Sequence, residues 1–178
     1  IFPEGIYVQV SSIADVHTIL ADKPVRVIIN LNEDTGAGLD PQQAQKPLPF
    51  SKREIFISLD PFLPQEKEPL LAQQLERLTA QGYRQFIVNN PAHISLLRSK
   101  ENFLVAGPYL YTFNCWALSW LQENGIYAYI PPAESSRENI ETVFVPELRP
   151  HVLLPLFSYP ALFRMPFVLP KNYNFLYF

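Results

Sequence analysis

The sequence predicts an α/β fold built around a parallel sheet, and three observations lead to this prediction. Short apolar runs alternate with segments that have helical periodicity. Some runs, such as Val25–Leu31, are largely apolar without strict alternation, as expected of a strand covered on both faces. Helix-start signals follow the apolar runs, so the chain repeats a strand-then-helix unit.

The first units of the repeat begin at Tyr7. We expect Tyr7–Val10 to form a short strand, and Ser12 and Asp15 match a capping box that opens the next helix. The apolar run Val25–Leu31 is the second strand. Residues 33–52 contain glycines and prolines without periodicity, and we expect them to form a long loop.

The later units follow the same pattern. The expected strands are Ile55–Leu59, Phe86–Val88, Phe103–Val105, Ile126–Ile130 and Val152–Phe157. One expected helix buries Leu71, Leu75 and Leu78 and is ended by Gly82. A short helix is expected from Pro91 to about Lys100, and another from Asn114 to Gly125. Ser135 is expected to cap a further helix. Trp116 and Trp120 lie four residues apart, and this spacing predicts that both belong to the core.

This alternation gives about seven strands, and it favours a parallel sheet with right-handed crossovers. The predicted fold is a parallel (β/α) barrel of the TIM type, which need not be complete in this chain. An open doubly wound sheet is the alternative, but no G-x-G-x-x-G follows any strand. We assign residues 1–157 to the barrel-like domain and the aromatic, proline-rich residues 158–178 to the start of a following region.

The composition excludes several classes of protein. Hydrophobic residues make up 48% of the 178 residues, which is enough for one domain with a sizeable core. A net charge of −3 with scattered Lys and Arg gives no basic patch for nucleic acid. The lone Cys115 excludes a cysteine-based zinc or iron–sulfur site made by this chain alone. No two of His17, His93 and His151 have metal-ligand spacing, so no metal site is expected.

The sequence shows no apolar run long enough to span a membrane and no signal peptide at its start. We therefore expect a cytoplasmic location and no membrane partner. The chain lacks an initiator methionine and stops within a strand-like segment. We interpret it as a piece of a longer protein, whose other domains are expected partners.

Polar residues close several of the predicted strands. In a parallel α/β fold the carboxyl ends of the strands lie on one face, where sites are built. The candidate site residues are Asp60, Asn89, Asn114 and Glu134. Asp60 and Glu134 could supply acid/base chemistry, pairing across the mouth of the barrel, and Asn89 could point into that mouth.

Local structure offers an alternative explanation for several of these polar residues. Asn90 and Asn114 precede helices, where an asparagine commonly caps the first turn. Asp60 precedes Pro61, and such a pair commonly makes a turn. Glu134 could be a solvated loop carboxylate. Asn89 is not needed as a cap, and Glu134 has no evident role in local structure, so these two are the candidates that local structure does not account for.

The order of these motifs resembles the peptidase U32 family. In the segment Gly82–Asn90 a strand ends at an Asn, and Asn114 later begins a helix. Gly125 is followed by a strand that leads into Ala133-Glu134-Ser135. The segments Val8–Val16 and Leu154–Phe157 also match. The resemblance implies a TIM-barrel-like domain, a hydrolase of the protease or collagenase class, and a peptide substrate. Glu134 and Asn114 are the positions that carry over.

The resemblance also implies an alternative, because relatives of this family act in RNA base hydroxylation with an iron–sulfur cluster. RNA would then be the substrate, and the cluster would belong to the full-length protein. The family's cysteines follow the last barrel strand, where this chain has Ser158–Phe163 without cysteine, and Ser135 stands where the family often has Leu. A non-catalytic module that supports a partner in a larger chain is the competing hypothesis, motivated by the aromatic residues 159–178.

Overall fold

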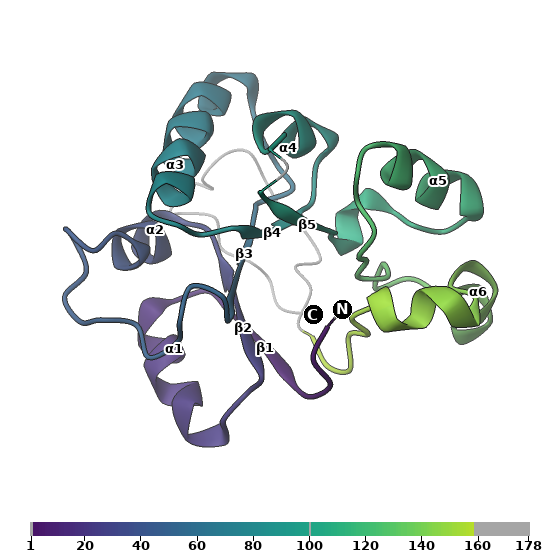
Figure 1. Ribbon diagram of the computed structural model, residues 1–178, viewed down its shortest axis with the longest axis horizontal. Coiled ribbons are helices and arrows are strands. Elements are labelled where there is room, and N and C mark those ends of the chain that lie inside the picture. Colours follow the sequence, from purple (N-terminus) through teal and green to yellow (C-terminus); the bar gives the residue numbers. More distant parts are fainter. Residues whose placement is uncertain (1, 100, 159–178) are drawn as a thin grey trace, which may run out of the picture.

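A computed structural model describes residues 2–99 and 101–158 and shows an α/β fold with an all-parallel sheet (Figure 1). The sheet has five strands in the order in which they occur in the chain. They are β1 (Tyr7–Val10), β2 (Arg26–Asn30), β3 (Ile55–Ser58), β4 (Gln85–Val88) and β5 (Phe103–Ala106). The sheet is open, with β1 and β5 at its two ends. The predicted parallel α/β class is therefore confirmed.

Two predicted strands are reduced to single bridge positions. Ala106 pairs in parallel with Tyr129, and Tyr129 pairs in parallel with Val152, so the chain continues beyond β5 in the same order. Prolines limit both segments, because Pro131 and Pro155 have no N–H to donate to a ladder. The predicted strands Ile126–Ile130 and Val152–Phe157 were therefore too long.

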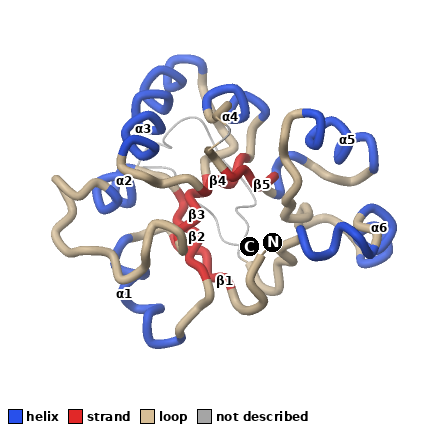
Figure 2. The backbone as a smooth tube through the Cα atoms, in the orientation of Figure 1, coloured by secondary structure: helices blue, strands red, loops and turns tan. Residues whose placement is uncertain are grey.

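The helices lie outside the curved row of strands (Figures 1 and 2). Among the described residues the α-helices are α1 (Ile13–Thr18), α2 (Glu33–Leu39), α3 (Glu68–Ala80), α4 (Pro91–Leu96), α5 (Cys115–Glu123) and α6 (Arg137–Val143). Short 3₁₀ helices are η1 (Ile19–Asp22), η2 (Gln65–Lys67), η3 (Pro108–Leu110) and η4 (Pro146–His151). No helix of the described residues is long and apolar enough to cross a membrane.

The helices start and stop where short polar residues and glycine allow it. Ser12, Asn90 and Asn114 each accept a hydrogen bond from a backbone N–H of the helix that follows, as predicted. Gly82 and Gly125 adopt positive φ just beyond α3 and α5, which favours glycine there.

Four local predictions were wrong. Residues 33–52 contain helix α2, which begins because Asn32 and Thr35 form a reciprocal capping box that composition alone did not reveal. The cap of α6 is Ser136 rather than Ser135, since the Ser136 side chain accepts from Asn139 N–H at 3.1 Å.

Helix α4 ends at Leu96, short of the predicted Lys100. Trp116 and Trp120 are not core residues: their exposed fractions are 82% and 45%, whereas Leu118 and Leu121 are the buried residues of α5.

Two hydrophobic clusters lie on opposite faces of the sheet. The larger one joins the strands to the helices, for example through Ile57 and Leu75. The smaller one contains Ile28, Phe56, Ile87, Val105, Ala128 and Ile130, with Phe2, Tyr7, Phe103 and Leu153 packed against it. None of these members belongs to a helix. The sheet thus has a helix-covered face and a second, helix-free face. The predicted aromatic tail falls almost entirely on residues 159–178, which lie outside the described residues.

Candidate functional site

A row of polar side chains lies on the helix-free face at the carboxyl ends of β1 to β4. Gln9, Asn30, Ser58 and Asn89 each follow by two positions a member of the helix-free cluster or a residue packed on it. Alternate residues of a strand point to the same face, so these four side chains share that face. We call them the carboxamide row, since three of the four are amides.

Hydrogen bonds connect the row in two pairs. Gln9 Nε2 donates to Asn30 Oδ1 at 2.6 Å, and Asn30 Nδ2 donates to Ser11 Oγ at 2.8 Å. Asn89 Nδ2 donates to Leu59 O at 2.8 Å and to Ser58 Oγ at 3.3 Å. The first pair is accessible, because Gln9 is exposed and Asn30 is half-buried. The second pair is buried, with 6% of Ser58 and 6% of Asn89 exposed.

Asn89 retains one unused hydrogen-bonding atom. Its Oδ1 is buried and has no partner. The atom faces Gly107, the residue after β5, where a Cβ would lie 1.9 Å from Oδ1. Glycine at this position therefore makes the space that the Asn89 carboxamide occupies. The amide orientation follows from the Leu59 carbonyl, which requires Nδ2 rather than Oδ1 opposite it.

His93 supports Asn89 from α4. The Asn89 N–H donates to His93 Nδ1 at 3.3 Å, which places the imidazole proton on Nε2. The side chain is fully buried, and burial lowers the pKa of His93 to about 4, while the nearby charge of Asp60 acts in the opposite direction. A histidine that stays neutral and buried holds the strand end in place rather than exchanging protons with a substrate.

Aromatic side chains close the amino end of the helix-free face. Phe2 contacts Tyr7, Phe56 and Phe103 with ring centroids 6.0, 6.1 and 6.2 Å away. Burial raises the pKa of the Tyr7 phenol, against the opposing effect of Arg26. The face is thus apolar at its amino end and polar at its carboxyl end. Access for a polar ligand is from the carboxyl end.

The structure brings one predicted site residue into the row, and the other three have local roles or positions outside it. Asn89 belongs to the row. Asp60 lies one residue beyond Leu59, and its Oδ1 accepts from Phe62 N–H at 2.8 Å in a turn. Asn114 caps α5 by accepting from Ala117 N–H at 3.0 Å, and its side chain is exposed. Glu134 is exposed in the turn that precedes α6.

Sequence reasoning missed Gln9, Asn30 and Ser58. Each is the last or next-to-last residue of its strand, and each stands among apolar neighbours. Ser58 lies within the run Ile55–Leu59 and Asn30 within Val25–Leu31, and neither run by itself singles out its polar residue. These residues can be identified as polar residues two positions after an apolar residue of the helix-free face. That identification requires knowing which side chains of each strand point to which face of the sheet.

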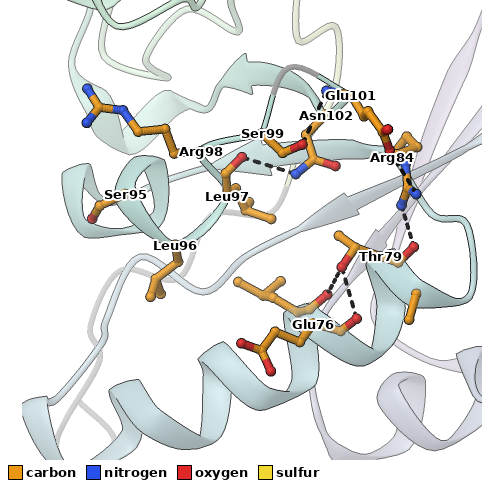
Figure 3. Close-up of a pocket in the computed structure, with 12 residues that line it drawn as sticks. Glu76, Thr79, Arg84, Ser95, Leu96, Leu97, Arg98, Ser99, Glu101 and Asn102 are labelled. Atoms are coloured by element: carbon orange, nitrogen blue, oxygen red, sulfur yellow. Dashed lines mark hydrogen bonds and ion pairs between the residues drawn. The ribbon is translucent and has the colours of Figure 1, made fainter.

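A cavity lies near the amino ends of β4 and β5, away from the carboxamide row (Figure 3). It has a volume of about 450 Å³ and lies between the ends of α3 and α4 and the segment before β5. Arg84 pairs with Glu101 at 3.2 Å there, and the Thr79 and Asn102 side chains donate to the backbone carbonyls of Leu75 and Leu97. Arg98 extends away from the other labelled side chains in Figure 3.

The donor set does not fit a metal or an iron–sulfur cluster. Within residues 2–99 and 101–158, no group of three or more His, Cys, Asp and Glu side chains could hold a metal ion. Cys115 is exposed and is the one cysteine of the chain, whereas a cluster needs several thiolates. We derive no chemistry through such a group. The row itself offers neutral donors and acceptors, which suit a neutral polar ligand.

Comparison with known proteins gives no relative: no family model, curated protein or solved structure matches the chain.

Proposed function

We propose that this chain is a TIM-type (β/α) barrel domain of the peptidase U32 type, which binds a peptide at the carboxyl ends of its strands. The carboxamide row is the observation that carries the proposal. The proposal assigns residues 1–157 to this domain and places its substrate on the helix-free face.

Two features support the barrel reading of the open sheet. The bridges from Ala106 to Tyr129 and on to Val152 continue the strand order past β5. Side chains also fill the helix-free face in levels, with aromatic rings at the amino end, aliphatic side chains in the middle and amides at the carboxyl end. A TIM barrel has its helices outside, an interior packed with side-chain layers and its site at the carboxyl end.

The chemistry of the row supports a peptide as the ligand. A side-chain carboxamide carries a carbonyl acceptor and an NH₂ donor, the same pair of functions as a peptide group. Gln9 and Asn30 are accessible and lie side by side, joined at 2.6 Å. They can therefore exchange their mutual hydrogen bond for bonds to an extended chain. Ser58 and Asn89 hold the neighbouring strand ends rigid.

The proposal gives the acid/base step to the carboxylates in the strand-end loops. Glu134 is exposed and follows the segment that bridges to Ala106, so it is free to approach a bound peptide group. Asp60 follows β3, beside the buried pair of the row. Glu134 would take a proton from the attacking water as a general base and then give it to the leaving amine nitrogen as the peptide C–N bond breaks, with Asp60 as the second carboxylate of the same face.

Glu134→Gln tests the catalytic part, because it keeps the shape and removes the charge. The assay is hydrolysis of a peptide mixture by the full-length protein, followed by mass spectrometry. A general base contributes about 10²- to 10⁴-fold in rate, and we expect a loss of that size. Glu138→Gln, an exposed carboxylate in the first turn of α6, is the matched control. Unchanged hydrolysis by Glu134→Gln would remove Glu134 from the mechanism.

A second candidate function has one observation in its favour. Trp116 and Trp120 are exposed on the same side of α5, with exposed fractions of 82% and 45%. Large exposed aromatic residues mark interaction surfaces. A non-catalytic module that uses α5 to contact another protein is therefore the alternative. It predicts that Trp116→Ala abolishes a protein–protein contact and leaves peptide binding unchanged.

A further inference from the structure

The loop after β5 carries a second feature of the strand-end face. It runs from Gly107 to Asn114 and starts with the 3₁₀ helix η3. Tyr111, which ends that helix, has a left-handed backbone with φ 50° and ψ 59°. An L-residue with a bulky side chain rarely adopts this conformation. Such strain persists only where surrounding contacts fix it, and it is concentrated at ligand sites.

The Tyr111 ring has one covered face and remains accessible. It stacks on Phe113, with ring centroids 5.9 Å apart and an interplanar angle of 21°. Its exposed fraction is 51%. The Phe113 ring therefore covers one face of the Tyr111 ring, while the Tyr111 side chain keeps an aromatic surface open to solvent.

The loop is anchored on both sides of this platform. Thr112 is fully buried, and the Phe113 carbonyl accepts from Asn139 Nδ2 of α6 at 3.0 Å. At the other side Leu110 N–H donates to Gly107 O at 3.1 Å, which closes a turn. Gly107 itself packs against the Asn89 carboxamide. Tyr111 is thus one residue beyond a turn that rests on the carboxamide row.

The spacing between the accessible amides and the platform suits a short extended chain. Asn30 ends β2, and the loop that carries the platform begins at Gly107, directly after β5 and three strands away from β2. Three inter-strand spacings amount to about 14 Å, the length of about four residues in extended conformation. A peptide of this length that bonds to Gln9 and Asn30 at one end therefore spans to the end of β5, where the loop that carries Tyr111 begins.

We propose that Tyr111 is the specificity platform of the site, where it stacks on the aromatic side chain of a peptide whose backbone bonds to the carboxamide row. This inference rests on the proposed function and adds the substrate class: peptides of at least about four residues with an aromatic residue at one end. Two aromatic rings prefer offset or edge-to-face contact, which an exposed, rigid ring allows without reordering.

The test is calorimetric titration of the full-length protein with blocked Ala/Ser pentapeptides that carry Phe first, Phe last or no Phe. We expect one Phe peptide to bind about two- to tenfold more tightly than the peptide without Phe. Tyr111→Asn should abolish this difference, because asparagine tolerates the left-handed backbone but lacks the ring. Tyr127→Ala is the control and should preserve the difference, because Tyr127 is 55% exposed but lies in the segment that bridges to Ala106 rather than in the loop after β5.

The outcomes separate the two proposals. If peptides bind through Gln9 and Asn30 but the Phe peptides bind no more tightly than the others, the platform inference is wrong and the proposed function stands. The same holds if the Tyr111→Asn variant still binds a Phe peptide more tightly. If no peptide binds at millimolar concentration, both are wrong. Binding of an oligosaccharide in place of peptides, dependent on Tyr111, would overturn the assignment of the ligand to the peptide class.

Discussion

Gly107→Ala should destabilise the protein through one neighbouring side chain. The new Cβ would lie 1.9 Å from Asn89 Oδ1 and 2.7 Å from Asn89 Cγ, closer than real contacts allow. Asn89 must therefore rotate and give up its bonds to Leu59 O and Ser58 Oγ. Two hydrogen bonds of about 1 kcal/mol each, with a buried polar group left unpaired, amount to a loss of about 3 kcal/mol.

A smaller opposing effect comes from the unfolded chain. Gly107 has φ −77°, which alanine adopts without strain, so the substitution itself stabilises by about 0.4–1 kcal/mol. The expected net loss in the free energy of unfolding is about 2 kcal/mol. Urea denaturation measures it as a lower midpoint with an unchanged slope.

A double-mutant cycle with Asn89→Ala checks the stated cause. With the carboxamide already removed, Gly107→Ala should be neutral or slightly stabilising, so the coupling between the two sites is about 2 kcal/mol. If Gly107→Ala costs as much in the Asn89→Ala background, the loss arises elsewhere. If it costs nothing in the native background, the contact of Gly107 with Asn89 is not what the structure describes.

Three further predictions concern His93, the cap of α5 and its exposed face. The pKa of His93 is about 4 in the folded state and about 6.5 in the unfolded state. The stability that neutral His93 contributes is therefore complete above pH 6.5 and is lost as pH falls toward 4, by about 3 kcal/mol in all. His93→Gln should flatten that part of a pH–stability curve, and an unchanged slope would refute the assignment. Asn114→Ala should cost about 1 kcal/mol in urea denaturation while Asn114→Ser costs little, because both Asn and Ser cap helices; equal losses would exclude capping. Trp116→Ala should change stability by no more than about 0.5 kcal/mol and Leu121→Ala should cost about 2–5 kcal/mol, and the reverse order would contradict their exposure.

The parallel class of the fold could be predicted because it depends on local patterns. Apolar runs such as Val25–Leu31 and caps such as Asn90 and Asn114 are determined by neighbouring residues. Helix α2 escaped prediction, since its start depends on a reciprocal bond between Asn32 and Thr35 rather than on apolar spacing. The four-residue spacing of Trp116 and Trp120 places them on one side of α5 but does not say whether that side is covered.

The candidate site was predictable only in part. Asn89 could be identified because it follows a strand and is not needed as a cap. The Gln9–Asn30 pair depends on the register between β1 and β2, which places two residues 21 positions apart in contact. The contact of Gly107 with Asn89 depends likewise on the pairing of β4 with β5. Such long-range pairings cannot be read from one sequence.

Backbone amide NMR during titration with a Phe-containing pentapeptide tests the central claim most directly. The claim is that the strand-end face of the sheet binds peptide. It predicts chemical-shift changes at Gln9, Asn30 and the Gly107–Asn114 loop, and none around Arg84 and Glu101. Changes confined to the cavity between α3 and α4, or no changes at millimolar peptide, would contradict it.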